Sequence, residues 1–484
     1  MIEKLKHLLK DSLIYGLGST VGKFIGVLLV PIFTRIFSPA EYGVIDLIGA
    51  ISSIISFILV LGLDSAVVRF YYADNDIKEK QTVISTGLLF QVAFSIVGCI
   101  ILFFCTDYIA IKVFKNLAYS IILKVSFITI PFTITISFLS MIFRINFAPW
   151  KYSGLVVAQV FLTASISIYL VVILRMGIIG VFYSSLITNV ILTPVGLFLS
   201  RFNYSLVFSI KRLKSLLSYG IPLVPASFSL LILNLADRFF LMHYSTLEQV
   251  GLYSIGIKLS SLLLVIVSAF QLGWAPFAFS ISKEKVAKEV YSKVLTYYML
   301  LSSFIAIGLS IFACDILKFV TTSQYVEGFK VVGMLSFGII AYGAYHIVSI
   351  GVHLTNKTSH IAWTLTVAAV MNLLLNFLLV PKYGMLGASF ATLVSYFIST
   401  YLLYRVSQKY YPIEYEIRKV TIICFVSWIL IIVGMLCNTS SVVLNLILKL
   451  LIIGSFPLIL FLLNIFEPKE IAYIKNFIGK VKGK

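Results

Sequence analysis

The chain has 484 residues, of which 60% are hydrophobic and only 12% are charged, and its mean hydropathy is +1.04. This composition excludes a soluble globular protein, and because apolar stretches recur along the whole length it also excludes a soluble domain with one anchor. The net charge of +19 does not indicate nucleic-acid binding, because the cations are spread over short loops between apolar stretches. The sequence therefore predicts an all-α polytopic membrane protein.

Apolar stretches of about 20 residues, the length that crosses a bilayer as a helix, follow one another along the chain. We expect about 14 transmembrane helices, near residues 12–36, 41–70, 82–105, 117–141, 153–174, 178–200, 215–243, 250–280, 291–314, 328–354, 359–380, 384–407, 418–437 and 441–465. An even number of crossings places both termini on one side of the membrane. Most Lys and Arg residues of the loops fall on that side, so both termini are predicted to be cytoplasmic.

Two pairs of short motifs recur at nearly the same spacing. The segment Arg175–Gly180 matches Lys382–Gly387, at an offset of 207 residues, and each copy precedes an apolar helix. The segment Ser38–Gly43 similarly matches Ser245–Gly251. Two matches at one offset indicate an internal duplication. Because each copy has six helices, the copies share an orientation, as parallel repeats do in transporters whose two lobes rock around a central site.

The duplication divides the chain into two six-helix lobes and a C-terminal addition. We expect a first lobe at 12–200, a basic cytoplasmic linker at 201–214, a second lobe at 215–407, an extra helix pair at 418–465 and a basic cytoplasmic tail at 466–484.

Charged residues inside the apolar stretches are the candidate functional residues. A charge at the bilayer centre costs about 2.5–3.5 kcal/mol on insertion scales, so it faces a watery cavity, a partner or a ligand. Four cations and two acids were identified there, Lys23, Arg69, Arg238 and Lys258 against Asp64 and Asp237. The excess of cations predicts a lumen that binds something anionic, with the two acids as ion-pair or ion-coupling candidates.

Some charged residues in the apolar stretches have a second interpretation. Lys23 has no acid one turn away, so a cavity is favoured for it over an ion pair between helices. Arg69 lies near the end of its stretch, where snorkelling to the membrane surface explains it as well as a substrate contact does. For Lys449, in the final helix, snorkelling or packing is the better explanation.

Prolines and histidines in the apolar stretches were considered in the same way. Pro222 and Pro225 open the second lobe and are the best hinge candidates, since proline kinks a membrane helix. His346, His353 and His360 recur every seven residues, but seven helical residues span about 10.5 Å, too far for two imidazoles to share a metal. No metal and no cofactor is therefore expected.

Several segments of the chain resemble one known family, the polysaccharide-transporter branch of the multidrug/oligosaccharidyl-lipid/polysaccharide exporter superfamily. The segments that carry the resemblance are Gly62–Phe70, Tyr219–Pro225, Asn234–Phe240, Val250–Leu259 and Pro381–Ala388. The likeness covers roughly residues 12–410, and the order and spacing of the segments are more specific than any one of them.

The resemblance implies a flippase for O-antigen or capsule repeat units, of the kind used in lipopolysaccharide and capsule biosynthesis, in the bacterial inner membrane. Such a protein moves undecaprenyl-pyrophosphate-linked oligosaccharide from the cytoplasmic to the periplasmic leaflet by alternating access. Asp64, Arg69, Asp237, Arg238 and Lys258 are carried over from the matching segments, whereas Lys23 rests on its burial alone. Implied partners are the lipid-linked substrate, membrane lipids, the polymerase or ligase machinery and a coupling ion, either a proton or sodium.

Two other functions were weighed against this one. A drug or metabolite exporter of the same superfamily would use a coupling acid in the first lobe, and Asp64 could serve as that acid. A membrane polysaccharide polymerase would need a large external loop or paired acidic residues for acid–base chemistry, and the sequence offers neither. The protein is therefore expected not to be an enzyme.

Overall fold

The computed structural model describes residues 16, 21–22, 24–437 and 441–466, and all regular structure in this part of the chain is helical. Candidate Lys23 and the predicted tail beyond residue 466 lie outside the described residues. The helices of the first half are α2 (Val30–Phe33), α3 (Pro39–Val60), α4 (Leu63–Ala73), α5 (Ile77–Phe104), α6 (Thr106–Ile109), η1 (Ala110–Phe114), η2 (Leu117–Tyr119), α7 (Ser120–Ile145), α8 (Pro149–Ile168), η3 (Tyr169–Ile173) and α9 (Ile178–Ser200). Those of the second half are α10 (Ile210–Gly220), η4 (Ile221–Leu223), α11 (Val224–Tyr244), α12 (Leu247–Ser260), α13 (Leu262–Ser280), α14 (Ala287–Val320), η5 (Ser323–Gly328), α15 (Phe329–Val348), α16 (Ile350–Leu354), α17 (Ser359–Tyr410), α18 (Ile417–Leu436) and α19 (Val442–Leu462).

The prediction of an all-α polytopic membrane protein is confirmed. Within the described residues, 12 helical segments are long and apolar enough to cross a membrane, and Phe24–Phe33 forms a shorter apolar helix. The count of fourteen stays a prediction. It counted α17 as two crossings, and α17 is interrupted at Gly384, where φ is 52° and ψ is −130°. A Cβ atom on Gly387 would lie 2.6 Å from the carbonyl oxygen of Leu379, so the chain folds back on itself at this break.

The repeated motifs mark the starts of α3 and α12. At α3 the Ser38 hydroxyl accepts from the Glu41 backbone N–H at 3.3 Å, and the Glu41 carboxylate accepts from the Ser38 N–H at 2.8 Å. This capping box satisfies backbone donors that the first helical turn leaves free. At α12 the hydroxyl of Thr246 accepts from the Gln249 N–H at 3.2 Å. The sequence repeat is thus a repeated helix start.

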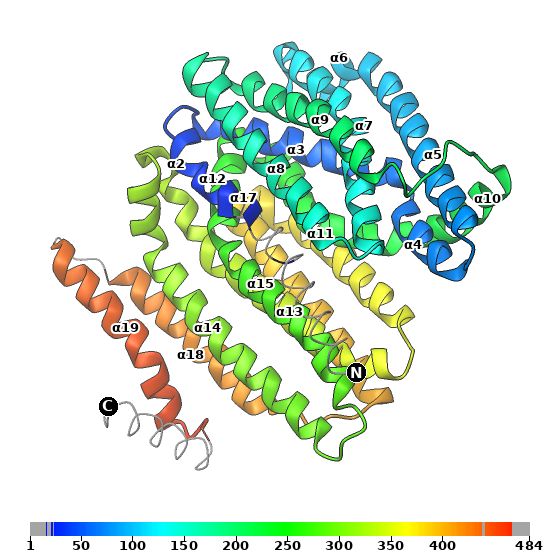
Figure 1. Ribbon diagram of the computed structural model, residues 1–484. Coiled ribbons are helices and arrows are strands. Elements are labelled where there is room, and N and C mark those ends of the chain that lie inside the picture. Colours follow the sequence, from blue (N-terminus) through cyan, green and yellow to red (C-terminus); the bar gives the residue numbers. More distant parts are fainter. Residues whose placement is uncertain (1–15, 17–20, 23, 438–440, 467–484) are drawn as a thin grey trace, which may run out of the picture.

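Apolar clusters follow the proposed division into lobes, which we keep as first lobe (12–200) and second lobe (215–407). Two clusters have nearly all of their buried members in the first lobe, and the largest lies within the second lobe and the C-terminal helices. A fourth cluster joins the lobes, with Tyr42 and Val30 on one side and Val250, Tyr253 and Tyr325 on the other. Figure 1 shows the two halves side by side, blue to teal above and green to orange below.

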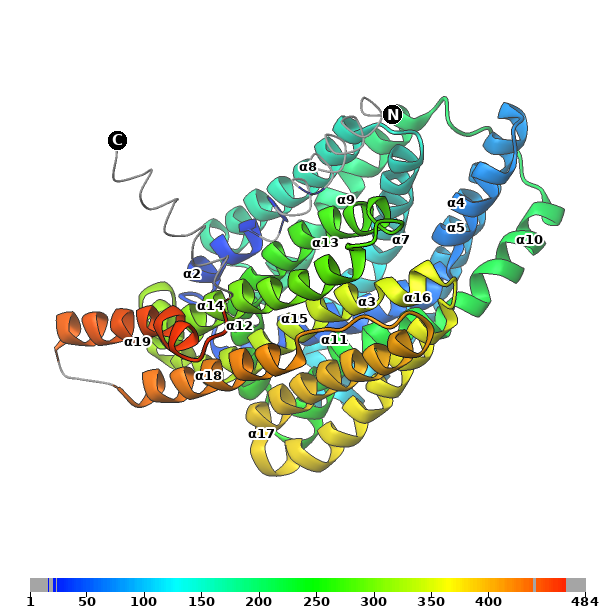
Figure 2. The same ribbon diagram turned by 90° about the horizontal axis from the view of Figure 1, so that it is seen from below.

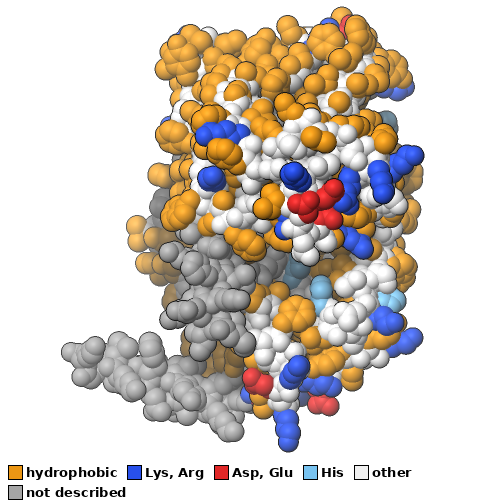
Figure 3. Space-filling view, turned by 45° about the vertical axis from the view of Figure 1, so that its right-hand side comes forward, with side chains coloured by type: hydrophobic (Ala, Val, Ile, Leu, Met, Phe, Trp, Pro, Cys, Tyr) orange, Lys and Arg blue, Asp and Glu red, His pale blue; other side chains and the backbone are white. Residues whose placement is uncertain are grey.

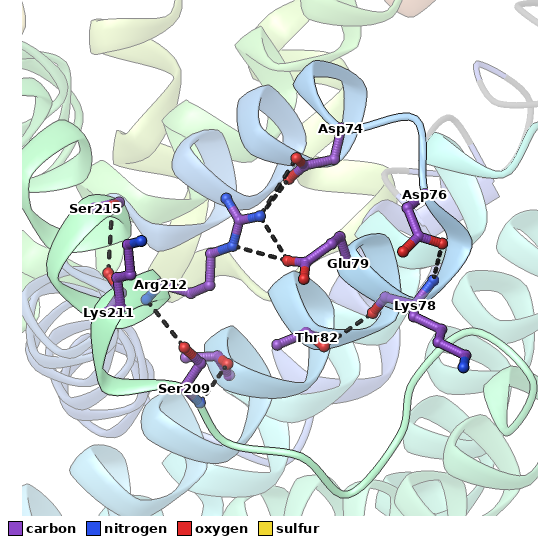
Figure 4. Close-up of polar contacts among 10 residues, drawn as sticks. Asp74, Asp76, Lys78, Glu79, Thr82, Ser209, Lys211, Arg212 and Ser215 are labelled. Carbon is purple, nitrogen blue, oxygen red and sulfur yellow. Dashed lines mark hydrogen bonds and ion pairs between the residues drawn. The ribbon is translucent and has the colours of Figure 1, made fainter.

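The linker between the lobes is held against the first lobe by an ion-pair cluster. Arg212, on α10, donates from Nη2 to the Glu79 carboxylate at 2.6 Å and lies 3.2 Å from the Asp74 carboxylate (Figure 4). Ser209 caps α10, and its backbone N–H donates to the Thr86 hydroxyl at 3.1 Å. The second half therefore begins with a helix at residue 210, ahead of the span that we expected to begin at 215, and one candidate membrane span covers Ile210–Tyr244.

Charged side chains are spread over the face of the molecule seen in Figure 3. Lys and Arg side chains (blue) are numerous there, and Asp and Glu (red) form a few small groups, the most prominent of them beside Lys and Arg side chains. Which face of the cell membrane this surface meets stays a prediction, and below we call the side opposite the predicted cytoplasmic loops the predicted outer side.

The C-terminal helix pair is fixed to the second lobe by a buried charge. α18 and α19 pack along α14 at the edge of the molecule (Figures 1 and 2). Lys449 is only 2% exposed, and its Nζ donates to the Asp315 carboxylate of α14 at 2.5 Å. Of the two explanations weighed for Lys449, this contact supports packing and excludes snorkelling.

Asp315→Asn is expected to lower the free energy of unfolding by about 1–3 kcal/mol, because it removes the carboxylate, itself 39% exposed, that accepts from the buried Lys449 ammonium. Thermal unfolding of the purified protein measures the loss. The double variant Asp315→Asn/Lys449→Met removes both charges and should recover most of the stability. A double variant as unstable as the single one would show that the pair is not what holds α19.

Candidate functional site

The two lobes are in backbone contact where α3 crosses α12. A Cβ atom added to Gly43 would lie well under 3.0 Å from the carbonyl oxygen of Leu247, and one added to Gly251 equally close to that of Pro39. Both glycines belong to the repeated motifs. Glycine is required here because the helices approach too closely for any side chain.

Aromatic and polar contacts extend this closure on the predicted outer side. The Tyr325 hydroxyl donates to the carbonyl oxygen of Phe37 at 2.9 Å. The Tyr325 ring packs edge-on against the Tyr42 ring, with 5.9 Å between the ring centroids. The Thr322 hydroxyl donates to the carbonyl oxygen of Thr34 at 3.4 Å. The lobes are therefore closed against each other at this end.

We call the contact of α3 in the first lobe with α11 and α12 in the second lobe the seam. Arg238 lies in this seam and pairs with an acid of the other lobe. It is 8% exposed, and its Nε donates to the carboxylate of Asp46 on α3. Its Nη1 also donates to the carbonyl oxygen of Asn234 at 2.6 Å. The hydroxyl of Ser254 donates to the same Asp46 oxygen at 2.6 Å. A buried Arg–Asp pair thus connects α11 and α12 of one lobe to α3 of the other.

Sequence reasoning missed Asp46. It lies inside the predicted span 41–70, so the criterion that selected Asp64 would have found it. Its presence changes the charge balance of the seam, because Arg238 is neutralised in this conformation.

Lys258 contacts the same face of α3 one turn away. Its Nζ donates to the hydroxyl of Tyr42 and lies 4.8 Å from the centre of that ring. Tyr42 and Asp46 are four residues apart on α3, so the structure brings Arg238 and Lys258 together at one helix face.

Asp237 points away from this seam into the second lobe. It is 2% exposed and accepts from the hydroxyl of Tyr253, from Asn376 Nδ2 at 2.8 Å and from the Thr392 hydroxyl at 2.5 Å. Among the described residues no Lys or Arg forms an ion pair with it. It borders a cavity of about 150 Å³ that Tyr342 and other polar groups also line.

Arg69 and Asp64 do not meet. The guanidinium of Arg69 stacks on the ring of Tyr219 at 4.3 Å, where the first lobe contacts α10. Asp64 lies in the first turn of α4, and its carboxylate accepts from the Ser65 N–H at 2.8 Å. The predicted site residues therefore fall into separate regions. Arg238 and Lys258 lie in the seam, Asp237 borders the second-lobe cavity, and Arg69 lies where the first lobe contacts α10, which we call the linker end.

The hinge candidates coincide with a helix break. Pro222 lies in the 3₁₀ turn η4, and Pro225 is in the first turn of α11. A second break separates α3 from α4 at Gly62, where φ is +68°. The two breaks touch, because a Cβ on Gly62 would lie 2.5 Å from the carbonyl oxygen of Gly220. Movement at Pro222 and Pro225 stays a proposal.

Two further cavities differ sharply in character. The larger, about 710 Å³, runs along α5 between Ser85 and Phe104 and is lined mainly by apolar side chains. The smaller, about 230 Å³, lies between the lobes and is lined by Phe57, Asp64, Ser65, Gln91, Ser137, Phe138, Arg144, Val224 and Ser227 among others. No group of three His, Cys, Asp or Glu residues is placed to hold a metal within the described part of the chain.

The fold and seam define a helical membrane protein with two packed halves and charged groups where they meet. Residues 32–330, more than half of the chain, match the family described as polysaccharide biosynthesis protein. The chain therefore belongs to this family, and the resemblance to the polysaccharide branch of the exporter superfamily is confirmed.

Solved structures share the fold. The lipid II flippase MurJ, in an inward closed conformation, matches with a TM-score of 0.73 at 18% identity, over 94% of this chain and 99% of that one. An inward-facing multidrug resistance MATE family transporter matches with a TM-score of 0.66 at 12% identity, over 86% of this chain and 99% of that one.

Curated relatives match shorter stretches of the chain. An uncharacterized membrane protein of Methanocaldococcus jannaschii is 26% identical over 57% of this chain, which spans 55% of that relative's length. Protein 1 of the Lsg locus of Haemophilus influenzae is 23% identical over 66% of this chain and 77% of its own length.

Proposed function

We propose that this protein is a flippase that moves undecaprenyl-pyrophosphate-linked oligosaccharide from the cytoplasmic to the periplasmic leaflet of a bacterial inner membrane. Membership of the polysaccharide biosynthesis family supports a glycan substrate. The fold shared with the lipid II flippase MurJ supports a lipid-linked one. O-antigen and capsule repeat units are the substrates that this proposal covers.

The observation that carries the proposal is the buried pair Arg238–Asp46 between the lobes, with Lys258 one turn away. A diphosphate cannot enter hydrocarbon, whereas its polyprenyl tail can stay in lipid. Arg binds phosphate by forked hydrogen bonds and Lys binds it as a point charge. The diphosphate would replace Asp46 as the anion beside Arg238, and this exchange would release the seam and let the lobes part on the predicted outer side.

Asp237 is the proposed coupling group. It is buried, has no ion-pair partner among the described residues and borders a cavity, which suits a carboxylate that binds a proton or sodium ion in one conformation and releases it in the other. Asp64 is the weaker candidate, since it lies in a different cavity. Arg69 and Lys23 remain proposed contacts of the anion, and the polymerase or ligase that uses the product is the proposed protein partner.

A drug or metabolite exporter is the second candidate. The fold that the chain shares with a multidrug resistance MATE family transporter is the observation that favours it. The substrate distinguishes the two functions.

Depletion of the protein is expected to cause a lipid-linked oligosaccharide to accumulate in the cytoplasmic leaflet, where an externally added glycosidase cannot reach it. Mass spectrometry of the extracted lipid identifies the glycan. Lys258→Ala should reproduce the accumulation and Lys258→Arg should largely prevent it, because the charge beside Tyr42 is retained. Absence of any such lipid, together with increased sensitivity to toxic cations, would support the exporter instead.

A further inference from the structure

The cavity of about 230 Å³ between the lobes has the composition of a carbohydrate site, and we infer that it binds sugar hydroxyls of the transported substrate. This inference rests on the proposed function. It assigns to Gln91, Ser137, Arg144 and Ser227 a role that neither the seam nor the Asp237 cluster performs.

Both lobes build this cavity. Asp64 comes from α4, Gln91 from α5, Ser137 and Arg144 from α7, and Ser227 from α11 of the second lobe. The volume is several times the roughly 30 Å³ that one water occupies in the liquid. Because both lobes contribute, a bound ligand would contact both and would be sensitive to their movement.

Gln91 is the observation that points to a ligand. Its side chain is 3% exposed and lines the cavity, and its Oε1 accepts no hydrogen bond within the described residues. An unsatisfied buried acceptor costs about 1–3 kcal/mol, so a donor supplied by a ligand or by solvent is needed in the filled site. A sugar hydroxyl is such a donor.

The other lining groups match the same class of ligand. Serine hydroxyls both donate and accept, Asp64 accepts and Arg144 donates, which complements the mixed donors and acceptors of a sugar ring. Phe57 and Phe138 add apolar surface for the ring faces. Asp64 and Arg144 carry opposite charges, so the cavity has no net attraction for a diphosphate and favours the neutral part of the substrate.

The position of the cavity allows one substrate to reach both regions. Ser227 and Arg238 are eleven residues apart on α11, about 16 Å along the helix axis. A diphosphate at Arg238 and Lys258 would thus leave its attached sugars free to extend toward the linker end. The cavity would bind the sugars and the seam would bind the diphosphate.

Binding to the purified protein in nanodiscs tests this assignment with two probes. One is farnesyl diphosphate, and the other is the lipid-linked oligosaccharide recovered from depleted cells. Gln91→Leu should bind the oligosaccharide at least about tenfold more weakly than the wild type, with farnesyl diphosphate binding unchanged, because a site built to hydrogen-bond hydroxyls loses most when a polar partner is removed. Ser227→Ala, on the opposite lobe, should weaken the same probe by a smaller factor.

Gln271→Leu is the matched control. Gln271 also has a buried amide nitrogen with no partner among the described residues, but it lines a different cavity with Trp274 and His346. This variant should bind both probes as the wild type does. Equal oligosaccharide binding by wild type, Gln91→Leu and Ser227→Ala would overturn the sugar site and leave the flippase proposal standing. Failure of the wild type to bind either probe, with no lipid accumulating on depletion, would instead overturn the proposed function.

Discussion

Replacing Gly251 with alanine is expected to abolish transport by preventing the predicted outer side from closing. The new methyl would lie well under 3.0 Å from the carbonyl oxygen of Pro39, so α3 and α12 must move apart. Overpacking of this kind costs about 1–3 kcal/mol, which shifts a two-state equilibrium by about 5–150-fold. Gly43→Ala should act in the same way, because its methyl would meet the carbonyl oxygen of Leu247.

A single reporter cysteine measures the opening. Val250 is fully buried in the apolar cluster that joins the two lobes. The variant Val250→Cys, made in a chain whose 5 native cysteines have been replaced, should therefore resist a membrane-impermeant maleimide. Adding Gly251→Ala should make it react from outside the cell. Gly49→Ala is the control, since Gly49 lies on the same helix as Gly43 and an added Cβ there meets no atom of the described residues within 4 Å. Unchanged labelling and transport in Gly251→Ala would remove the glycine crossing from the mechanism.

Arg238→Ala is expected to reduce both the amount of protein in the membrane and the surface polysaccharide. It leaves the Asp46 carboxylate in the seam without its counter-charge, a loss of about 3–5 kcal/mol for a buried pair. Membrane abundance and surface polysaccharide are measured in the same cells. Loss of polymer in this variant alone therefore cannot separate a folding defect from a loss of substrate binding.

The double variant Asp46→Asn/Arg238→Gln separates them. Removing both charges should return membrane abundance close to the wild-type level, because neither member of the pair is left as a charge without its partner. Surface polysaccharide should stay absent, since the guanidinium that binds the diphosphate is gone. A double variant that makes normal amounts of polymer would confine Arg238 to a structural role and leave Lys258 as the cation of the seam.

The sequence alone was enough to predict the local features of the chain, namely its helices and its repeated motifs. Apolar stretches of sufficient length form helices because the bilayer leaves the backbone no other way to satisfy its hydrogen bonds. The caps at Ser38 and Thr246 act on the residues directly after them, so the repeated motif was visible without coordinates. The family resemblance likewise followed from short segments of the chain, such as Gly62–Phe70 and Val250–Leu259.

Partners from distant segments needed the tertiary structure. Arg238 meets Asp46 across 192 residues, and Lys449 meets Asp315 across 134. Gln91 looks like any polar residue in a helix until two lobes enclose it. The sequence by itself determined that the protein is built of apolar segments long enough to cross a membrane and that charged residues lie inside them. Only the packing of the helices decided which charges are neutralised and which polar groups line a cavity, because side-chain pairing depends on how helices far apart in the chain approach and rotate against one another.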